Sequence, residues 1–514
     1  MAKEVELKLI AAPRVLSMAA RQPWLRALAT GKARTEKLVS VYFDTSKCDL
    51  RRHDVSLRIR TIGRRRLQTV KTATNGSALG RGEWEQEIDG DVPDLALAKN
   101  TPLGSLLSGK KGNGLHPVFE TAVERKSLPL RYGSSDIELA IDRGWIRAGG
   151  RRERIGEIEL ELKDGDPADL AKMAKRLADT VRVSWGARAK AERGYALSDG
   201  LRHAAFEATD IRLAVARSCG EAFGVIGQSC LHHFAANNDA VRKGDTHGIH
   251  QMRVGLRRLR AAISVFKDML AGAETEEIKS ELKWLTGQLA PARDYDVLLR
   301  DSLVPLRDAE PDSPEIALLA AEIERRRDSG IADAKATVAS ARYRTLVLRT
   351  ALWLAAGDWT EDADALALAR RETPVAEFAR DALARRTGKI LKKSGKLSAL
   401  DAHKRHKLRI SVKKLRYATE FFADLFATSG GTKARRHFEA AVKALQQALG
   451  RLNDITTHEK LAHEFATAAA RNAQSAPEAY AMGYLTGREQ KTVRTSLADA
   501  RKARKKLSDA EPFW

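Results

Sequence analysis

The chain has 514 residues, of which 43% are apolar, so it is long enough to bury a core in two or more domains. No stretch approaches the ~20 consecutive apolar residues that cross a bilayer, which argues against a membrane-spanning protein. The first residues lack the apolar segment of a secretory signal, so we expect a cytoplasmic location. A net charge of +23 predicts a polyanionic partner, such as nucleic acid, an anionic membrane surface or a phosphate polymer.

Residues 1 to about 165 alternate apolar and polar side chains in short segments, separated by Gly, Asp, Ser and Asn. Alternation of this kind predicts a β-rich domain. The predicted strands are 4–11, 39–45, 56–62, 67–73, 83–88, 136–142 and 157–163. Residues 12–30 and 167–180 have a period of 3.6 instead, which predicts helices packed on or into the sheet.

From about residue 205 the sequence becomes rich in Ala, Leu and Arg with long helical periods, interrupted near 305–316, 386–401 and 427–433. Residues 250–260 align without a gap on 406–416, and each copy is followed by a second matching stretch, at 285–298 and at 445–458. We therefore expect an α+β multidomain protein, with a β domain over 1–200 and an all-helical domain over 201–514. The helical domain should contain two duplicated halves, at about 210–355 and 370–510.

Each predicted strand has one apolar and one charged face. Glu4, Glu6 and Lys8 share one parity, and the same holds for the three glutamates of the segment GEIELELK. For any single strand, a solvated outer face of an antiparallel sheet is the common explanation. However, carboxylates cluster on the first and last strands, whereas Arg and Lys lie on the middle ones, namely Arg58, Arg60, Lys71 and Arg125. This segregation favours a barrel with a charged interior.

Closure of such a barrel would bring Glu4 and Glu6 beside Glu157 and Glu159. Hard divalent ions such as Mg²⁺ or Mn²⁺ bind through carboxylates together with substrate phosphates, and arginine forks match phosphate oxygens. The pattern therefore predicts a site for a metal-bound polyphosphate.

At these residues the sequence resembles the CYTH family, the triphosphate tunnel metalloenzymes, whose N-terminal ExExK motif corresponds to Glu4, Glu6 and Lys8. Further matches, in the family's order, are YFDT with Asp44, the Arg58/Arg60 pair, TVKTA, FETAVERKSL, AIDRG, GEIELEL and KAERGYAL. The resemblance implies an eight-stranded antiparallel tunnel with a catalytic set of Glu4, Glu6, Lys8, Glu157 and Glu159. It also implies triphosphate binding by Lys8, Arg58, Arg60, Lys71, Arg125, Lys190 and Arg193, and Mg²⁺ or Mn²⁺ binding by Glu4, Glu6, Glu157 and Glu159, with Glu161 and Asp142 as secondary candidates.

The repeated helical segment carries a basic stripe in each copy. The first contains His250, Arg253, Arg257 and Arg260, and the second contains His406, Arg409, Lys413 and Arg416. A solvated polar face is the alternative for one such helix, but these stripes contain almost no acidic partners and occur twice, which favours a polyanion groove. This half resembles the CHAD domain through both copies and through the ARDYD and RLNDI segments, and the resemblance implies binding of inorganic polyphosphate.

The leading hypothesis is an inorganic triphosphatase that cleaves triphosphate to diphosphate and phosphate, fused to a polyphosphate-binding domain. One alternative is a hydrolase of an organic triphosphate, such as thiamine triphosphate or a nucleotide. Another is a non-catalytic polyphosphate-binding or granule-associated protein. RNA binding is disfavoured, because only 6% of residues are aromatic and no stacking platform stands out.

Overall fold

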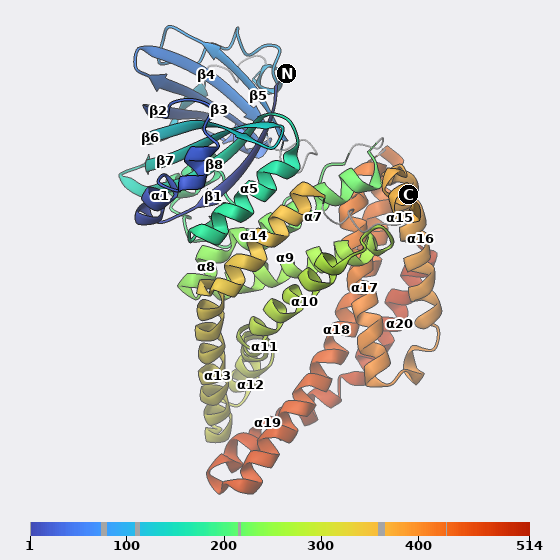
Figure 1. Ribbon diagram of the computed structural model, residues 1–514. Helices are drawn as coiled ribbons and strands as arrows, with labels where there is room; N and C mark the ends of the chain where they lie inside the picture. Colours follow the sequence, from blue (N-terminus) through green and yellow to red (C-terminus); the bar gives the residue numbers. More distant parts are fainter. Residues whose placement is uncertain (1, 73–79, 108–113, 214–216, 358–364, 428) are drawn as a thin grey trace. The chain divides into compact units, whose positions relative to one another are not determined.

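The computed structural model describes residues 2–72, 80–107, 114–213, 217–357, 365–427 and 429–514 (Figure 1). The chain divides into two compact units. The first comprises Met1–Ala204 and Ser340–Glu361, and the second comprises Ala205–Ala339 and Asp362–Trp514.

The first unit is built on an antiparallel sheet that closes on itself. Its strands are β1 (Ala2–Ile10), β2 (Arg34–Thr45), β3 (Val55–Ile62), β4 (Arg65–Thr72), β5 (Gly80–Glu87), β6 (Leu115–Tyr132), β7 (Ser135–Ala148), β8 (Arg151–Asp164) and the short β9 (Ser184–Trp185). They are ordered β5-β4-β3-β2-β6-β7-β8-β1-β9, and β5 also pairs with β1. Because β5 pairs with β1, the eight strands from β1 through β8, as far as they are described, form a closed ring. This ring is the predicted eight-stranded tunnel.

The apolar face of the sheet points outward and is covered by helices. Leu9, Leu139 and Leu160 pack beneath α1 (Pro13–Ala19), α2 (Pro23–Ala27) and α5 (Pro167–Thr180). On the other side of the tunnel, Leu57 and its neighbours are covered by α3 (Asp49–Arg52) and α4 (Pro102–Leu106). These helices cover the apolar side chains on both outer surfaces of the sheet. The charged side chains, which have the opposite parity on each strand, therefore line the tunnel.

Strand β6 is absent from the segments predicted by alternation, because its apolar residues change parity along the strand. Phe119 and Val123 lie in a cluster with Tyr195, whereas Leu128 and Leu130 pack with the outer core beneath α5. Helices were correctly predicted over 12–30 and 167–180, where α1, α2 and α5 lie.

One helix of the first unit comes from far along the sequence. Helix α14 (Ala341–Ala356) contacts α5 and β9, and its Leu348 and Leu352 belong to the same core cluster as Leu9. The first unit therefore needs a segment that the sequence pattern assigned to the helical domain.

Among its described residues, the second unit consists of helices and the loops that connect them, apart from one isolated β-bridge between Ser218 and Pro374. Its main helices are α7 (Cys219–Ala236), α8 (Asn238–Lys243), α9 (Thr246–Val265), α10 (Ala273–Gln288), α11 (Ala290–Leu298), α12 (Val304–Ala309), α13 (Pro314–Ala339), α15 (Ala365–Glu372), α16 (Val375–Lys393), α17 (Ala402–Phe422), α18 (Ser429–Arg471), α19 (Ala476–Gln490) and α20 (Val493–Asp509). The repeated basic segments lie on α9 and α17, which pack against each other. The interruption expected at 427–433 is shorter than predicted, because α18 already begins at Ser429. Across the described ranges, no helix combines the length and apolarity required to traverse a membrane.

Candidate functional site

One end of the tunnel is closed by the helix α6 (Lys190–Ser198). Tyr195 of α6 packs edge-on against Phe119, which in turn stacks on Tyr42 with ring centroids 4.4 Å apart. The Tyr195 hydroxyl donates to Asp44 Oδ2 at 2.8 Å. Asp44 also accepts backbone N–H bonds from Thr45, Leu50 and Arg51, at 2.7, 2.9 and 3.1 Å. Asp44 of the YFDT motif thus anchors the helix that closes the tunnel.

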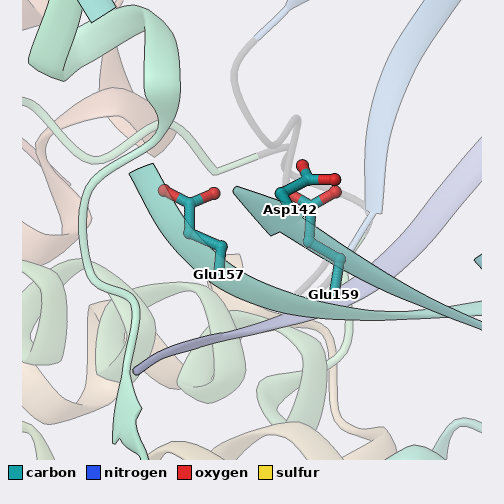
Figure 2. Close-up of side chains that lie close together, drawn as sticks. All are labelled: Asp142, Glu157 and Glu159. Atoms are coloured by element: carbon teal, nitrogen blue, oxygen red, sulfur yellow. The ribbon is translucent and has the colours of Figure 1, made fainter. Parts of the chain in front are cut away.

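Three buried carboxylates meet inside the tunnel. Asp142 of β7 lies opposite Glu157 of β8 in the strand register, and Glu159 follows on the same face of β8. Their ligand oxygens all lie within 4.8 Å of one another. Figure 2 shows the three side chains extending from these two neighbouring strands. We refer to Asp142, Glu157 and Glu159 as the acidic trio.

The acidic trio is already paired with cations. Lys190 Nζ lies 2.8 Å from Asp142, 2.7 Å from Glu157 and 2.6 Å from Glu159. Arg125 forms two 2.7 Å hydrogen bonds to Asp142 and also bonds Glu159. Arg193 bonds Glu157 and donates to Glu153 at 2.7 Å. The structure therefore brings together Arg125, Lys190 and Arg193 with three of the predicted acidic residues.

These ion pairs set the protonation states. Burial alone would raise the pKa of Glu159, but Lys190, Arg125 and Lys8 hold it well below its usual range. Burial would likewise lower the pKa of Lys190, whereas the acidic trio raises it well above the ordinary value. Both groups are therefore charged at neutral pH.

A second group of cations lines β3 and β4. Lys71 Nζ lies 3.2 Å and Arg58 3.7 Å from Glu83, and Arg58 also donates to the Tyr42 hydroxyl at 3.5 Å. Burial, together with Arg58 and Arg125, lowers the pKa of Arg60 to about 10. Burial opposes ionisation of Tyr42, but the cations Arg58, Arg60 and Lys190 outweigh it and lower the Tyr42 pKa. An oxyanion bound here would relieve the repulsion between these cations.

The strand register corrects one expectation. Strand β1 does lie beside β8, but Lys8 pairs with Glu159, and Glu6 pairs with Glu161. Glu6 and Glu161 thus lie one step along the tunnel from the acidic trio rather than beside it. Lys8 Nζ is 3.8 Å from Glu159. The backbone of Glu4 pairs with Arg81 of β5, and its side chain lies outside the described residues.

Sequence reasoning did not single out Glu138, Tyr42 or Glu153. Glu138 lies opposite Glu161 on β7, so Glu6, Glu161 and Glu138 form a second acidic row across three strands. Strand parity could have indicated two of these residues. Glu138 lies on the same face of its strand as Asp142, and Tyr42 lies on the same face as Asp44.

In the second unit the two basic stripes converge. Burial and the nearby Arg257 of α9 lower the pKa of both Arg409 and Lys413 of α17. Burial, Arg409 and Arg257 together lower the pKa of Lys413 to about 7. Burial, Arg293 and Arg257 lower the pKa of His250 to about 4, so this predicted member of the stripe is neutral at pH 7.

Several neighbours fix these side chains. Arg253 donates to the Thr286 carbonyl and to Asp294, both at 3.3 Å, and His406 Nδ1 lies 2.6 Å from Asn453 Oδ1. Arg416 lies over the ring of Tyr417 at 4.6 Å, and Arg260 is exposed. We refer to Arg253, Arg257, Arg293, Arg409 and Lys413 as the basic cluster.

Comparison with known proteins agrees with this architecture. The family model of the CYTH domain matches residues 2–195, and that of the CHAD domain matches residues 225–463. The inorganic triphosphatase of Haemophilus influenzae is 30% identical over 203 residues, which are 38% of this chain and 55% of that protein. An uncharacterised Mycobacterium tuberculosis protein is 27% identical over 285 residues, 51% of this chain and 52% of that protein.

The chain spans about half the length of the curated relatives that it matches. Among solved structures, the CHAD domain from the plant Ricinus communis matches 60% of this chain and 98% of its own, with 29% identity and a TM-score of 0.51. This chain therefore combines a CYTH domain over residues 2–195 with a CHAD domain over residues 225–463.

Proposed function

We propose that the protein hydrolyses inorganic triphosphate to diphosphate and phosphate in a divalent-metal-dependent reaction. The supporting observation is the tunnel itself, in which the buried Arg58 and the partly buried Arg125 share one interior with the acidic trio. The Haemophilus influenzae relative, which is named an inorganic triphosphatase, matches over 38% of this chain and supports the same substrate class.

The tunnel carboxylates fit a hard cation. The acidic trio offers oxygen donors from three residues within 4.8 Å, and a cation is already stabilised among them, namely the ammonium of Lys190. Carboxylate oxygens are the ligands that Mg²⁺ and Mn²⁺ prefer. Such an ion would be held by this trio, with Glu4, Glu6 and Glu161 as further proposed ligands, and when bound it would neutralise charge on the substrate phosphates.

The chain's own residues would bind and orient the substrate. Arg58, Arg60, Lys71 and Arg125 present guanidinium and ammonium donors to the phosphate oxygens, with Lys8, Lys190 and Arg193 beside the carboxylates. Helix α6 blocks one end of the tunnel with packed rings and so limits water there. Positioning and charge neutralisation of this kind account for most catalysis of phosphoryl transfer.

An organic triphosphate is the weaker candidate. At the closed end, Tyr42 already stacks on Phe119 and Tyr195 packs edge-on against Phe119, so these three aromatic side chains already pack against one another. A thiazolium or nucleobase would have to displace that packing to stack there.

For the helical unit we propose binding of inorganic polyphosphate. The basic cluster contains cations from both repeats, which lie on α9, α11 and α17. Partial burial of these side chains strengthens their interaction with a multivalent anion. Association with polyphosphate granules would follow from such binding.

The test measures phosphate release by the purified protein from inorganic triphosphate, ATP, thiamine triphosphate and long-chain polyphosphate, with and without Mg²⁺ or Mn²⁺. We expect metal-dependent turnover that favours inorganic triphosphate. Glu6→Gln should lower kcat/KM by about 100-fold, because the substitution removes the charge of a tunnel carboxylate while the side chain keeps nearly the same shape.

Glu124→Gln is the matched control, since Glu124 is exposed and has the outward parity of β6. Full activity of Glu6→Gln would overturn the catalytic role assigned to Glu6. Silence of the wild type on every substrate, with tight polyphosphate binding, would overturn the enzymatic proposal and favour the binding-protein alternative.

A further inference from the structure

Lys190 occupies the centre of the acidic trio. Its Nζ lies 2.6–2.8 Å from an oxygen of each of the three carboxylates, and its side chain is only 13% exposed. It is the first residue of α6, so its ammonium enters the tunnel from the closed end.

The oxygens that would bind a metal ion already contact the Lys190 ammonium. Mg²⁺–oxygen distances are about 2.0–2.1 Å, shorter than the 2.6–2.8 Å contacts of Lys190 to the same residues. A metal ion bound by the trio would therefore lie within a few ångströms of an ammonium ion in a buried site, where repulsion between like charges is strong. The trio is also bonded by Arg125 and Arg193, so its negative charge is already compensated.

The rest of α6 can stay in place if Lys190 leaves. The helix is held independently by the Tyr195 bond to Asp44 and by Arg193, which donates to Glu153 and to the carbonyl of Arg154, both at 2.7 Å. Only the flexible Lys190 side chain needs to change rotamer.

We propose that Lys190 is an internal counter-ion that competes with the divalent metal for Asp142, Glu157 and Glu159. This inference rests on the proposed function in that it takes the metal as the tunnel's cofactor. When a metal and a phosphate chain enter together, Lys190 transfers from the carboxylates to a phosphate oxygen. Metal binding is therefore weak without phosphate and strengthened by it.

The experiment measures Mn²⁺ binding to the full chain in the absence of phosphate, with free Mn²⁺ quantified by electron paramagnetic resonance. We expect Lys190→Met to bind Mn²⁺ about tenfold more tightly than the wild type, because the competing charge is gone. An imidotriphosphate probe should tighten Mn²⁺ binding to the wild type, and less so in Lys190→Met.

Two further variants separate competition from a general charge effect. Lys175→Met removes one positive charge from an exposed position on α5 and should leave Mn²⁺ affinity near the wild-type value. Lys190→Arg retains the charge and should not bind Mn²⁺ more tightly than the wild type. Equal or weaker Mn²⁺ binding by folded Lys190→Met overturns the inference.

A measurement on the wild type covers the case in which Lys190→Met does not fold. In a crystal structure with Mn²⁺ bound to the trio, Lys190 Nζ should lie beyond about 4 Å from these carboxylates. Mn²⁺ on the trio with Lys190 still in contact overturns the competition. Because neither measurement uses turnover, loss of triphosphatase activity counts only against the proposed function.

Discussion

At the scale of single residues, the charged groups of both units are partly buried and set each other's protonation states. In the tunnel, cations and carboxylates alternate, and the pKa of Lys190 rises. In the basic cluster the cations outnumber their partners, so Lys413 has a pKa of about 7, with Asp454 as the acidic group that opposes the shift. A lysine is thus held charged in the tunnel, whereas a lysine of the basic cluster titrates near neutral pH.

Polyphosphate binding should consequently weaken as pH rises through 7. Lys413 is protonated at pH 6 and largely neutral at pH 8 in the free protein, so binding at pH 8 must include proton uptake. We expect an affinity loss of up to about tenfold from pH 6 to pH 8 at constant salt, measured by filter binding. Lys413→Arg should reduce this loss, since a guanidinium stays charged throughout.

Lys407→Arg, at an exposed position of the same helix, is the control and should keep the wild-type pH dependence. Titration of the polyphosphate ends is common to all three proteins and cancels in the comparison. An unchanged pH dependence in Lys413→Arg would exclude Lys413 as the titrating group.

At the scale of elements, α6 positions two functional side chains. Lys190 and Arg193 lie on its first turn, while Tyr195 and Leu197 pack into the closed end of the tunnel. The placement of both cations therefore depends on the contact between α6 and the buried Asp44.

Tyr195→Phe should destabilise the tunnel unit by about 1–2 kcal/mol, because it leaves one buried oxygen of Asp44 without its hydroxyl donor. The ring packing against Phe119 is retained. Thermal unfolding with and without denaturant measures the change, and Tyr480→Phe, at a residue 66% exposed, is the matched control. Equal stabilities of the two variants would show that the hydroxyl contributes nothing to anchoring α6.

At the scale of the whole molecule, the two units are interleaved in sequence. Helix α14 is encoded between α13 and α15 of the helical unit, but Leu348 and Leu352 are 7% and 8% exposed in the core of the tunnel unit. A fragment ending near residue 204 would lack these side chains.

Leu352→Ala should destabilise the tunnel unit by about 2–3 kcal/mol, through lost burial and the cavity left behind. Hydrogen exchange of the α5 amides, followed by mass spectrometry, reports on this unit directly. Leu366→Ala, at a residue 58% exposed, should change stability by less than about 0.5 kcal/mol. Unchanged exchange in Leu352→Ala would mean that α14 is dispensable for the tunnel.

The sequence alone was sufficient for the features that depend on local periodicity. A period of two predicted most strands and the charged parity that lines the tunnel, and a period of 3.6 predicted α1, α5 and the repeated basic stripes on α9 and α17. Both domains were identified from motifs whose residues lie close together along the chain.

Only the tertiary structure decided which of these residues meet. Strand register depends on pairing between distant segments, so Glu6 lies beside Glu161 although parity alone allowed Glu157 or Glu159. Parity also cannot place Lys190 against the acidic trio, because α6 approaches from outside the sheet. The chain's periodicity fixes the face on which a side chain lies, whereas packing of elements far apart in sequence fixes its neighbours, and at this site the neighbours determine the charge.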